Sequence, residues 1–421
     1  MIKPIEENRY LGRDLSTFST NLGLPRHRWY EFKEGFSETL VREAITEQST
    51  GKKKLRILDP FSGSGTTLVT AGRTGHTATG IEVNPFLSFA SQAKCASGEW
   101  ERGEFYDCLE SVLSETQHEV VSSLEGQSTF TETPGSEKWL FNRSVLRGFT
   151  ALDTVLNKID TYRDPLRLAL FASLMDCCNA RRDGKCLRYR KGWTTLGFNS
   201  ESLRRIFSLR ATMVFNDVTN HPFREKDLTI LQGDAREQLT NLEAKQYDLV
   251  VTSPPYLNSF DYSDVYRPEL FVGGFVKNNE ELRQIRLKTI RSHVQVSWQP
   301  ATNTSSPMLT PILKELSDKR LWDRRLPDMV QSYFEDMSDI LRELARVVRP
   351  AGQAWIVVST SAYGGVEIPV DLLLADVGTQ NGWCLKGVYV LRQLRASGQH
   401  YARGIKNSRP HLRESLIILQ R

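Results

Sequence analysis

Two consecutive prolines end an apolar stretch at residues 250–256, VVTSPPY. Each proline lacks a backbone donor and fixes φ at about −65°, so Ser253, Pro254, Pro255 and Tyr256 form a stiff ledge with outward-pointing carbonyl oxygens. The Ser253 hydroxyl and the Pro254 carbonyl are hydrogen-bond acceptors, and the Tyr256 ring offers a face for stacking. We interpret this ledge as a place where a planar polar group is held. The alternative is an extended turn that only joins a strand to a loop.

A glycine-containing loop, DPFSGSGTT, occupies residues 59–67 between an apolar stretch and a helical one. Gly63 and Gly65 allow a sharp turn and a close approach to a ligand, and the helix that follows favours polar or anionic groups at its N-terminus. A dinucleotide-binding loop would need a third glycine where Leu68 stands, and a phosphate-binding loop would need Gly-Lys-Ser/Thr. A tight turn without a ligand remains the alternative.

Three carboxylates follow the predicted strands. Glu82 lies at the end of the strand predicted over 77–83, where its carboxylate could accept hydrogen bonds from both hydroxyls of a ribose. Asp234 directly follows the strand predicted over 227–233, where it could accept a hydrogen bond from an adenine amino group. Asp59 ends the first strand. Each alone is an ordinary loop-capping acid, but together they lie where open α/β sheets bind ligands, and they favour a nucleoside with a cationic tail.

The motifs DPFSGSG, GIEVNP, LQGDA and TSPPY resemble those of the amino-group DNA methyltransferases, which modify N4 of cytosine or N6 of adenine with S-adenosylmethionine. The resemblance implies catalysis at the ledge and a cofactor site comprising Asp59, Phe61, Gly63, Gly65, Thr66, Glu82, Asp234 and Ala235. A serine in the first ledge position, Ser253, implies cytosine N4 more than adenine N6. A segment before the loop often closes over the methionine end of the cofactor in this family, and Phe36 and Ser37 are the candidates here.

The chemistry of this family explains the residue types. An exocyclic amine is a poor nucleophile because its lone pair is delocalised into the ring. Acceptors on both amino hydrogens would pull the nitrogen towards tetrahedral geometry, so catalysis would be mostly orientation and electrostatics, with no metal. A base inside a duplex must be flipped out to reach such a ledge.

The elements that must position these motifs alternate between apolar strands and helices, which predicts a doubly wound α/β fold. The resemblance makes this a Rossmann-like seven-stranded methyltransferase sheet with helical insertions. The predicted strands are 53–60, 77–83, 227–233, 247–253, 354–360 and an antiparallel pair, 386–394 with 413–420. We also expect a helix over 37–45 capped by Ser37 and one that closes at Gly75.

Two long segments interrupt the catalytic core, which we assign to residues 1–94 and 227–421. Residues 95–226 are expected to be a mostly helical insertion and the candidate target-recognition region. Residues 257–335 form a second insertion, with an irregular loop over 297–311.

A basic stretch at residues 179–193 combines six cations with Tyr189 and Trp193. Such density suits DNA phosphates, and the aromatic rings suit an unpaired base. The candidates are Arg181, Arg182, Lys185, Arg188, Arg190 and Lys191, and a solvated cationic turn is the alternative. Secondary candidates are the loop 257–271 and the tail 397–413, with His400, Arg403, Lys406 and Arg409.

The bulk properties limit the other readings. The chain has 421 residues, a formal net charge of +5 and no long apolar run or signal core, so we expect a cytoplasmic protein without a membrane span. Its six cysteines lack CxxC spacing, which favours reduced thiols over disulfides or a zinc site. The remaining alternatives are an RNA or protein amide methyltransferase, a catalytically silent DNA-binding subunit and a dehydrogenase. DNA and a cognate restriction endonuclease are the expected partners.

Overall fold

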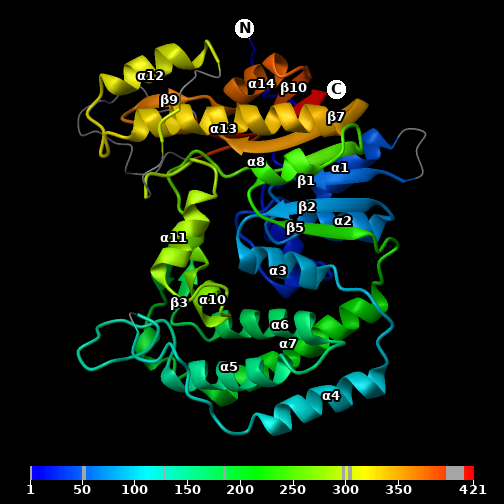
Figure 1. Cartoon of the computed structure of the whole chain (residues 1–421), viewed down its shortest axis with the longest axis vertical. Helices are drawn as coiled ribbons and strands as arrows, with labels where there is room; N and C mark the ends of the chain where they lie inside the picture. Colours follow the sequence, from blue (N-terminus) through cyan, green and yellow to red (C-terminus); the bar gives the residue numbers. More distant parts are fainter. Residues whose placement is uncertain are drawn as a thin grey trace.

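A seven-stranded mixed sheet forms the upper half of the molecule in a computed structural model that describes residues 2–49, 54–127, 129–183, 186–295, 299–301, 306–394 and 412–421 (Figure 1). The strand order is β10-β11-β7-β6-β1-β2-β5. The strands are β1 Arg56–Asp59, β2 Thr77–Glu82, β5 Leu228–Gln232, β6 Tyr247–Thr252, β7 Val348–Ser359, β10 Cys384–Gln393 and β11 Arg413–Gln420. The predicted seven-stranded Rossmann-like α/β sheet is confirmed.

Strand direction follows the prediction. The five strands from β5 to β7 are parallel neighbours, while β11 is antiparallel to both β7 and β10. β7 is longer than predicted, because pairing with β6 already begins at Val348.

Helices cover both faces of the sheet because side chains alternate along each strand. On one face Ile57 and Val251 pack against α1 Glu38–Gln48 and α2 Thr66–Thr74. On the other, Leu58 and Val250 pack with α13 Leu326–Val347 and α14 Val370–Gln380. Ser37 caps α1 by accepting from the Leu40 amide, and Gly75 ends α2, as expected.

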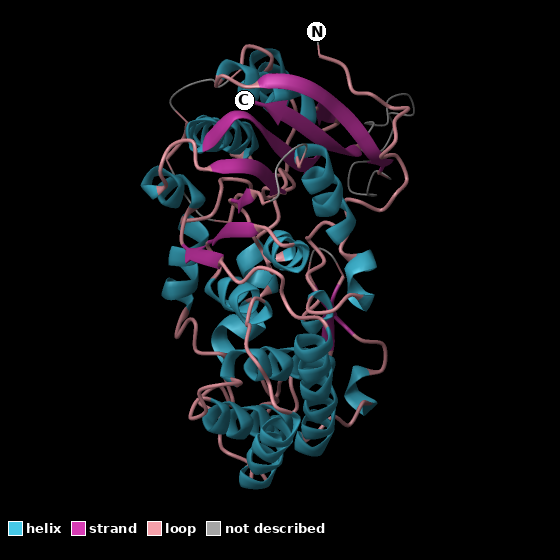
Figure 2. Cartoon of the chain, turned by 90° about the vertical axis from the view of Figure 1, so that its right-hand side faces the viewer, coloured by secondary structure: helices cyan, strands magenta, loops and turns pink. Residues whose placement is uncertain are grey.

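A layer of helices lies beyond the β5 edge of the sheet (Figures 1 and 2). Between α3 Pro85–Lys94 and β5 the chain forms α4 Arg102–Glu115, α5 Arg143–Leu156, α6 Arg163–Asp176, the hairpin β3 Ala180–Arg182 with β4 Leu187–Tyr189, and α7 Ser200–Asn220. The basic stretch is therefore largely a two-stranded hairpin.

Short helices follow β5 and β6 along the chain. They are α8 Ala235–Gln238, α9 Tyr262–Val265, α10 Arg267–Val272, α11 Asn279–Leu287 and α12 Leu309–Ser317, and a small hairpin, β8 Ser361–Tyr363 with β9 Val366–Ile368, lies beyond β7. Among these helices, α12 lies at the top of the molecule, against α13 and away from the helical layer (Figure 1). The predicted irregular loop over 297–311 is wrong at its end, where Leu309 begins α12. Leu309 is fully buried in the core around α13, and this burial stabilises α12.

The core of the helical layer includes residues far apart in the sequence. Trp29 and Tyr30 pack with Phe86 of α3 and with side chains from α5, α6 and α7. Asp217 of α7 is 1% exposed and accepts hydrogen bonds from the Arg26 amide at 2.9 Å and the Trp29 indole at 2.8 Å, and it pairs with Arg28. The N-terminal segment is therefore fixed to the end of the layer's last helix.

All six cysteines are free thiols, as expected. Across the described ranges, no helix combines the length and hydrophobicity that a bilayer crossing requires.

Candidate functional site

A cavity of about 250 Å³ lies at the carboxyl ends of β2, β5 and β6. It brings together nine of the predicted site residues, from the ledge and from the cofactor motifs: Phe61, Gly63, Glu82, Asp234, Ala235, Ser253, Pro254, Pro255 and Tyr256. The glycine loop and the diproline ledge therefore open onto one cavity, which is the arrangement a transfer reaction between two bound groups requires. Asp59, Gly65 and Thr66 do not line it.

The glycine loop is shaped by two close approaches. Gly63 has φ +51°, and a Cβ there would lie 2.5 Å from the ring of Phe32, which also lines the cavity. Gly65 has φ +83°, and a Cβ there would lie 2.4 Å from the Ser91 hydroxyl of α3. Gly63 therefore admits an aromatic wall to the cavity, while Gly65 admits the neighbouring helix.

Asp59 links the two halves of the site from beneath. Its carboxylate is 1% exposed and accepts from Thr67 at the start of α2 and from Thr252 at the end of β6, both at 2.7 Å. Burial raises the pKa of Asp59 to about 6, although these hydroxyl bonds oppose the rise. The structure thus gives Asp59 a positioning role between the glycine loop and the ledge.

Glu82 lies at the wall of the cavity. Its carboxylate accepts from the Gly63 and Asn84 amides, each at 2.8 Å, and these bonds orient it. Burial raises the pKa of Glu82 to about 7. Each carboxylate oxygen has a second lone pair, so the group can still accept from hydroxyls of a ligand in the cavity. Ile81, Val83 and Leu87 add apolar surface for a planar ring.

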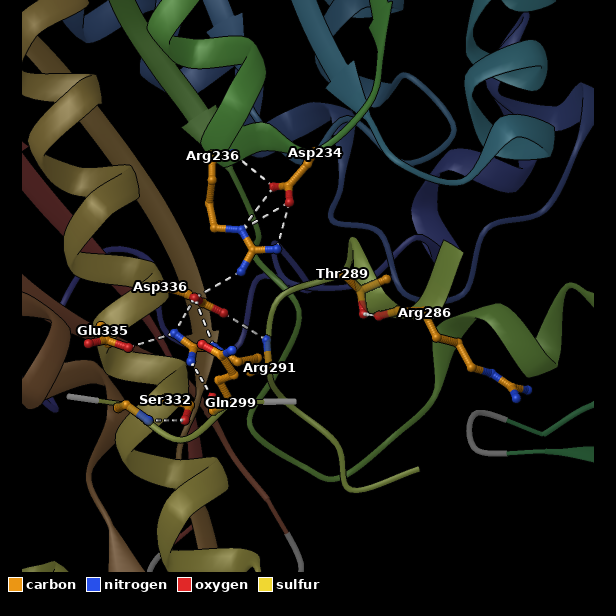
Figure 3. A network of polar contacts seen from close by, with 10 residues as sticks. Asp234, Arg236, Arg286, Thr289, Arg291, Gln299, Ser332, Glu335 and Asp336 are labelled. Carbon is orange, nitrogen blue, oxygen red and sulfur yellow. Dashed lines mark hydrogen bonds and ion pairs between the residues drawn. The ribbon is translucent and has the colours of Figure 1, made fainter. Parts of the chain in front are cut away.

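Asp234 lines the cavity but is held by its own helix (Figure 3). It caps α8 by accepting from the Arg236 amide at 2.9 Å, and the Arg236 guanidinium binds both carboxylate oxygens. A hydrogen bond from an adenine amino group to Asp234 would have to use carboxylate lone pairs that Arg236 does not occupy. That hydrogen bond stays a prediction.

An ion-pair network continues from Arg236 (Figure 3). Arg236 donates at 2.9 Å to Asp336 of α13, which is 2% exposed, and Asp336 also accepts from the Arg291 amide and guanidinium. Arg291 pairs in addition with Glu335. The network anchors residues 288–293, of which Lys288, Thr289, Ile290, Ser292 and His293 line the cavity.

The ledge itself presents an acceptor. Pro254 lines the cavity, and no donor in the described ranges contacts its carbonyl oxygen, so that oxygen can accept from a ligand. The Tyr262 hydroxyl accepts from the Tyr256 amide at 3.3 Å, and the Tyr363 hydroxyl donates to the Leu257 carbonyl at 3.1 Å. Burial raises the pKa of Tyr256 well above its usual value, while a hydrogen bond with the Ser253 side chain opposes the rise. Tyr256 is therefore a neutral ring beside an outward acceptor.

Several wall residues were not predicted. Phe32, Lys33 and Glu34 line the cavity in place of the candidates Phe36 and Ser37, which are buried beside α1. The Tyr266 hydroxyl binds Glu34 at 2.7 Å, and burial raises the pKa of Glu34. The run WYEFKE at 29–34 is a weak signal for this wall, because its aromatic residues could equally belong to a core.

The structure divides the basic candidates. Arg182 pairs with the buried Glu269 and lies over the Tyr266 ring, so its guanidinium is neutralised and enclosed within the protein, and its contact with DNA stays a prediction. Arg190 donates to the Met175 and Asp176 carbonyls at the end of α6, and its contact with DNA likewise stays a prediction.

The remaining basic candidates also stay predictions. Arg181, Arg188 and Lys191 are exposed, and Arg188 pairs with Asp183. Lys185, together with the secondary candidates His400, Arg403, Lys406 and Arg409, lies outside the described residues.

The arrangement suits a nucleoside beside a planar amine. Glu82 can accept from ribose hydroxyls, apolar side chains can enclose a ring, and the ledge can accept from an amino group. Among the described residues, no group of histidine, cysteine and carboxylate side chains could hold a metal ion.

Comparisons with known proteins give one consistent result. The chain is 27% identical over 410 residues to the type II methyltransferase M.AvaI of Nostoc sp., covering 90% of this chain and 84% of that protein. It is 25% identical over 463 residues to the type II methyltransferase M.BsoBI of Geobacillus stearothermophilus, covering 99% and 90%. The type II methyltransferase M.MvaI of Kocuria varians is 22% identical, covering 88% and 84%. No family model matches.

Solved structures resemble the chain only loosely. The rRNA methyltransferase aviRa of Streptomyces viridochromogenes aligns with a TM-score of 0.30 and 10% identity, covering 91% of this chain and 85% of that one. TrmN of Thermus thermophilus aligns with a TM-score of 0.27 and 9% identity, covering 91% and 48%. Overlaps this weak carry no argument about function.

Proposed function

We propose that this protein is a site-specific DNA methyltransferase that transfers a methyl group from S-adenosylmethionine to the exocyclic amine of a flipped base, with N4 of cytosine as the target. Its relatives over nearly the whole chain are type II methyltransferases, and S-adenosylmethionine is the methyl donor such relatives imply. The observation that carries the proposal is the single cavity shared by the glycine loop and the diproline ledge.

The cofactor supplies a methyl group already activated on a sulfonium sulfur. Glu82 would accept from its ribose hydroxyls, and Phe61 and Ile81 would pack against its ring, because all three line the cavity. Asp59 keeps this side of the site in register with the ledge through Thr67 and Thr252.

The ledge would hold the target amine. The Pro254 carbonyl and the Ser253 hydroxyl accept from the two amino hydrogens, which makes the nitrogen lone pair available for attack. The Tyr256 ring stacks on the base, and its neutral state avoids placing a charge beside it. Preorganised acceptors of this kind act through orientation and electrostatics, and no side chain needs to become covalently attached.

The choice of cytosine follows from Ser253, since the serine ledge resembles that of cytosine-N4 enzymes. The test is to incubate the protein with duplex DNA and methyl-labelled S-adenosylmethionine, digest the DNA and identify the labelled nucleoside. N4-methyldeoxycytidine is expected. N6-methyldeoxyadenosine would overturn the cytosine assignment but retain the methyltransferase.

Two further measurements distinguish an active methyltransferase from a catalytically silent DNA-binding subunit. Calorimetric titration with S-adenosylmethionine should show binding, and Ser253→Ala should lower the methylation rate while still binding the cofactor. The matched control is Ser259→Ala, because the Ser259 side chain contacts Met329 and does not line the cavity. Absence of cofactor heat and of labelled nucleoside in the unsubstituted protein would refute the proposal.

A further inference from the structure

A second cavity, of about 500 Å³, lies between the N-terminal segment, α6 and the β3–β4 hairpin. Six cationic side chains line it, against two carboxylates: Arg28, Lys33, Arg181, Arg182, Arg190 and Arg210 against Glu31 and Asp176. We call it the basic cleft.

Ion pairs neutralise half of these cations. Arg28 pairs with Asp217, Arg182 with Glu269, and Arg210 with Asp176. Lys33, Arg181 and Arg190 have no carboxylate partner among the described residues, and Glu31 is the one lining acid outside these pairs. The basic cleft therefore carries an excess of about two positive charges, which attracts an anion.

Two of these cations are able to reach a ligand. Arg181 is exposed, and its guanidinium has no hydrogen-bond or ion-pair partner in the described ranges. Lys33 is exposed and donates one hydrogen bond, to the Arg182 carbonyl, which leaves two ammonium hydrogens. Arg190 is instead occupied by the carbonyls at the end of α6.

The basic cleft adjoins the catalytic cavity. Lys33 lines both, and its neighbours in sequence, Phe32 and Glu34, line the catalytic one. A nucleotide held on the ledge is continuous with a backbone whose phosphates must pass close to the rim of that cavity.

We propose that the basic cleft binds a backbone phosphate of the DNA strand that carries the target base, with Arg181 and Lys33 as its ligands. This inference rests on the proposed function. It moves the DNA contact from the whole basic stretch to one side chain of the hairpin and one of the N-terminal segment.

The test is the salt dependence of DNA binding. Each phosphate contact contributes about 0.9 to the slope of log K against log salt, so Arg181→Ala should lower that slope by about 0.9 and weaken binding roughly fivefold at about 0.15 M salt. Arg181→Lys keeps the cation and should retain most of the slope. The charge-matched control is Arg102→Ala, because Arg102 is exposed and without an ion pair among the described residues, in α4 at the far end of the helical layer (Figure 1).

The outcomes separate this inference from the proposed function. Unchanged cofactor affinity in Arg181→Ala shows that its fold is intact. If the unsubstituted protein methylates DNA but Arg181→Ala keeps its slope, or changes no more than Arg102→Ala, the phosphate site is refuted and the methyltransferase stands. If inorganic phosphate competes with DNA for the unsubstituted protein but not for Arg181→Ala, the site is confirmed. If Arg181→Ala lowers the salt-dependence slope for RNA binding but not for DNA binding, DNA is refuted as the ligand of the basic cleft.

Discussion

Replacing Asp336 with asparagine tests the ion-pair network that anchors the wall of the catalytic cavity. Asp336 accepts four hydrogen bonds, one from Arg236 at 2.9 Å and three from Arg291 at 2.7 to 3.1 Å. The amide keeps the shape but loses the charge, and its NH₂ faces two guanidinium groups. Breaking a buried pair costs about 3–5 kcal/mol. Because the arginine side chains are 24% and 16% exposed, we expect the lower end, about 3 kcal/mol of unfolding free energy.

Urea unfolding measures this loss, with Asp339→Asn as the control on the same helix. Asp339 and its partner Arg342 are 46% and 59% exposed, so the control should lose less than about 1 kcal/mol. The anchored segment provides a second readout, because trypsin should cleave faster after Lys288 once Arg291 is released. Equal unfolding free energies and equal cleavage rates for the two variants would refute a role for the network in holding the wall.

Three further predictions concern the catalytic cavity. Ser253→Ala should lower kcat by about 5- to 100-fold, the equivalent of one lost hydrogen bond to a polar group, with an unchanged cofactor Kd; a kcat equal to that of Ser259→Ala would contradict it. Cofactor affinity should fall as the pH drops below about 7, because burial raises the pKa of Glu82 to about 7 and the protonated carboxyl group is a poor acceptor for ribose hydroxyls. Glu82→Gln should bind the cofactor more weakly and lose this pH dependence. Calorimetry from about one unit below to about one unit above this pKa would check both. Gly63→Ala should weaken cofactor binding at least about tenfold, because its Cβ would lie 2.5 Å from Phe32, whereas Gly12→Ala, with φ +72° and no atom within 4 Å, imposes similar backbone strain without the clash.

The sheet and the motifs at its carboxyl edge could be predicted because their signals are local. Val250 and Val251 are part of a continuously apolar strand, and Gly63 and Pro254 constrain their own backbone. The cavity wall around Thr289 could not be predicted, because its position depends on a contact between Arg291 and Asp336, 45 residues apart. Nothing in the local sequence distinguishes that pair from any exposed ion pair.

The basic stretch shows the same limit. The density of cations predicted a binding surface, but Arg182 forms an ion pair with Glu269 and Arg190 donates hydrogen bonds to carbonyls of α6. Only the fold brings these partners near. Charge counts along a sequence therefore overestimate the cations that can reach a ligand. The partners of Asp59 were also invisible in the sequence, since its carboxylate accepts from Thr67 of α2 and from Thr252 of β6, and its role as a cofactor ligand stays a prediction.

The contacts of Asp217 limit how this chain can be re-engineered. Any attempt to exchange residues 95–226 for the equivalent region of a relative would remove the acceptor of Arg26, Arg28 and Trp29. In such a hybrid the Trp29 indole and the Arg28 guanidinium would have no acceptor. The N-terminal segment that carries Phe32 and Lys33 would then no longer be fixed to α7. Successful chimeras must therefore carry α7 and the first residues of the chain as a matched pair.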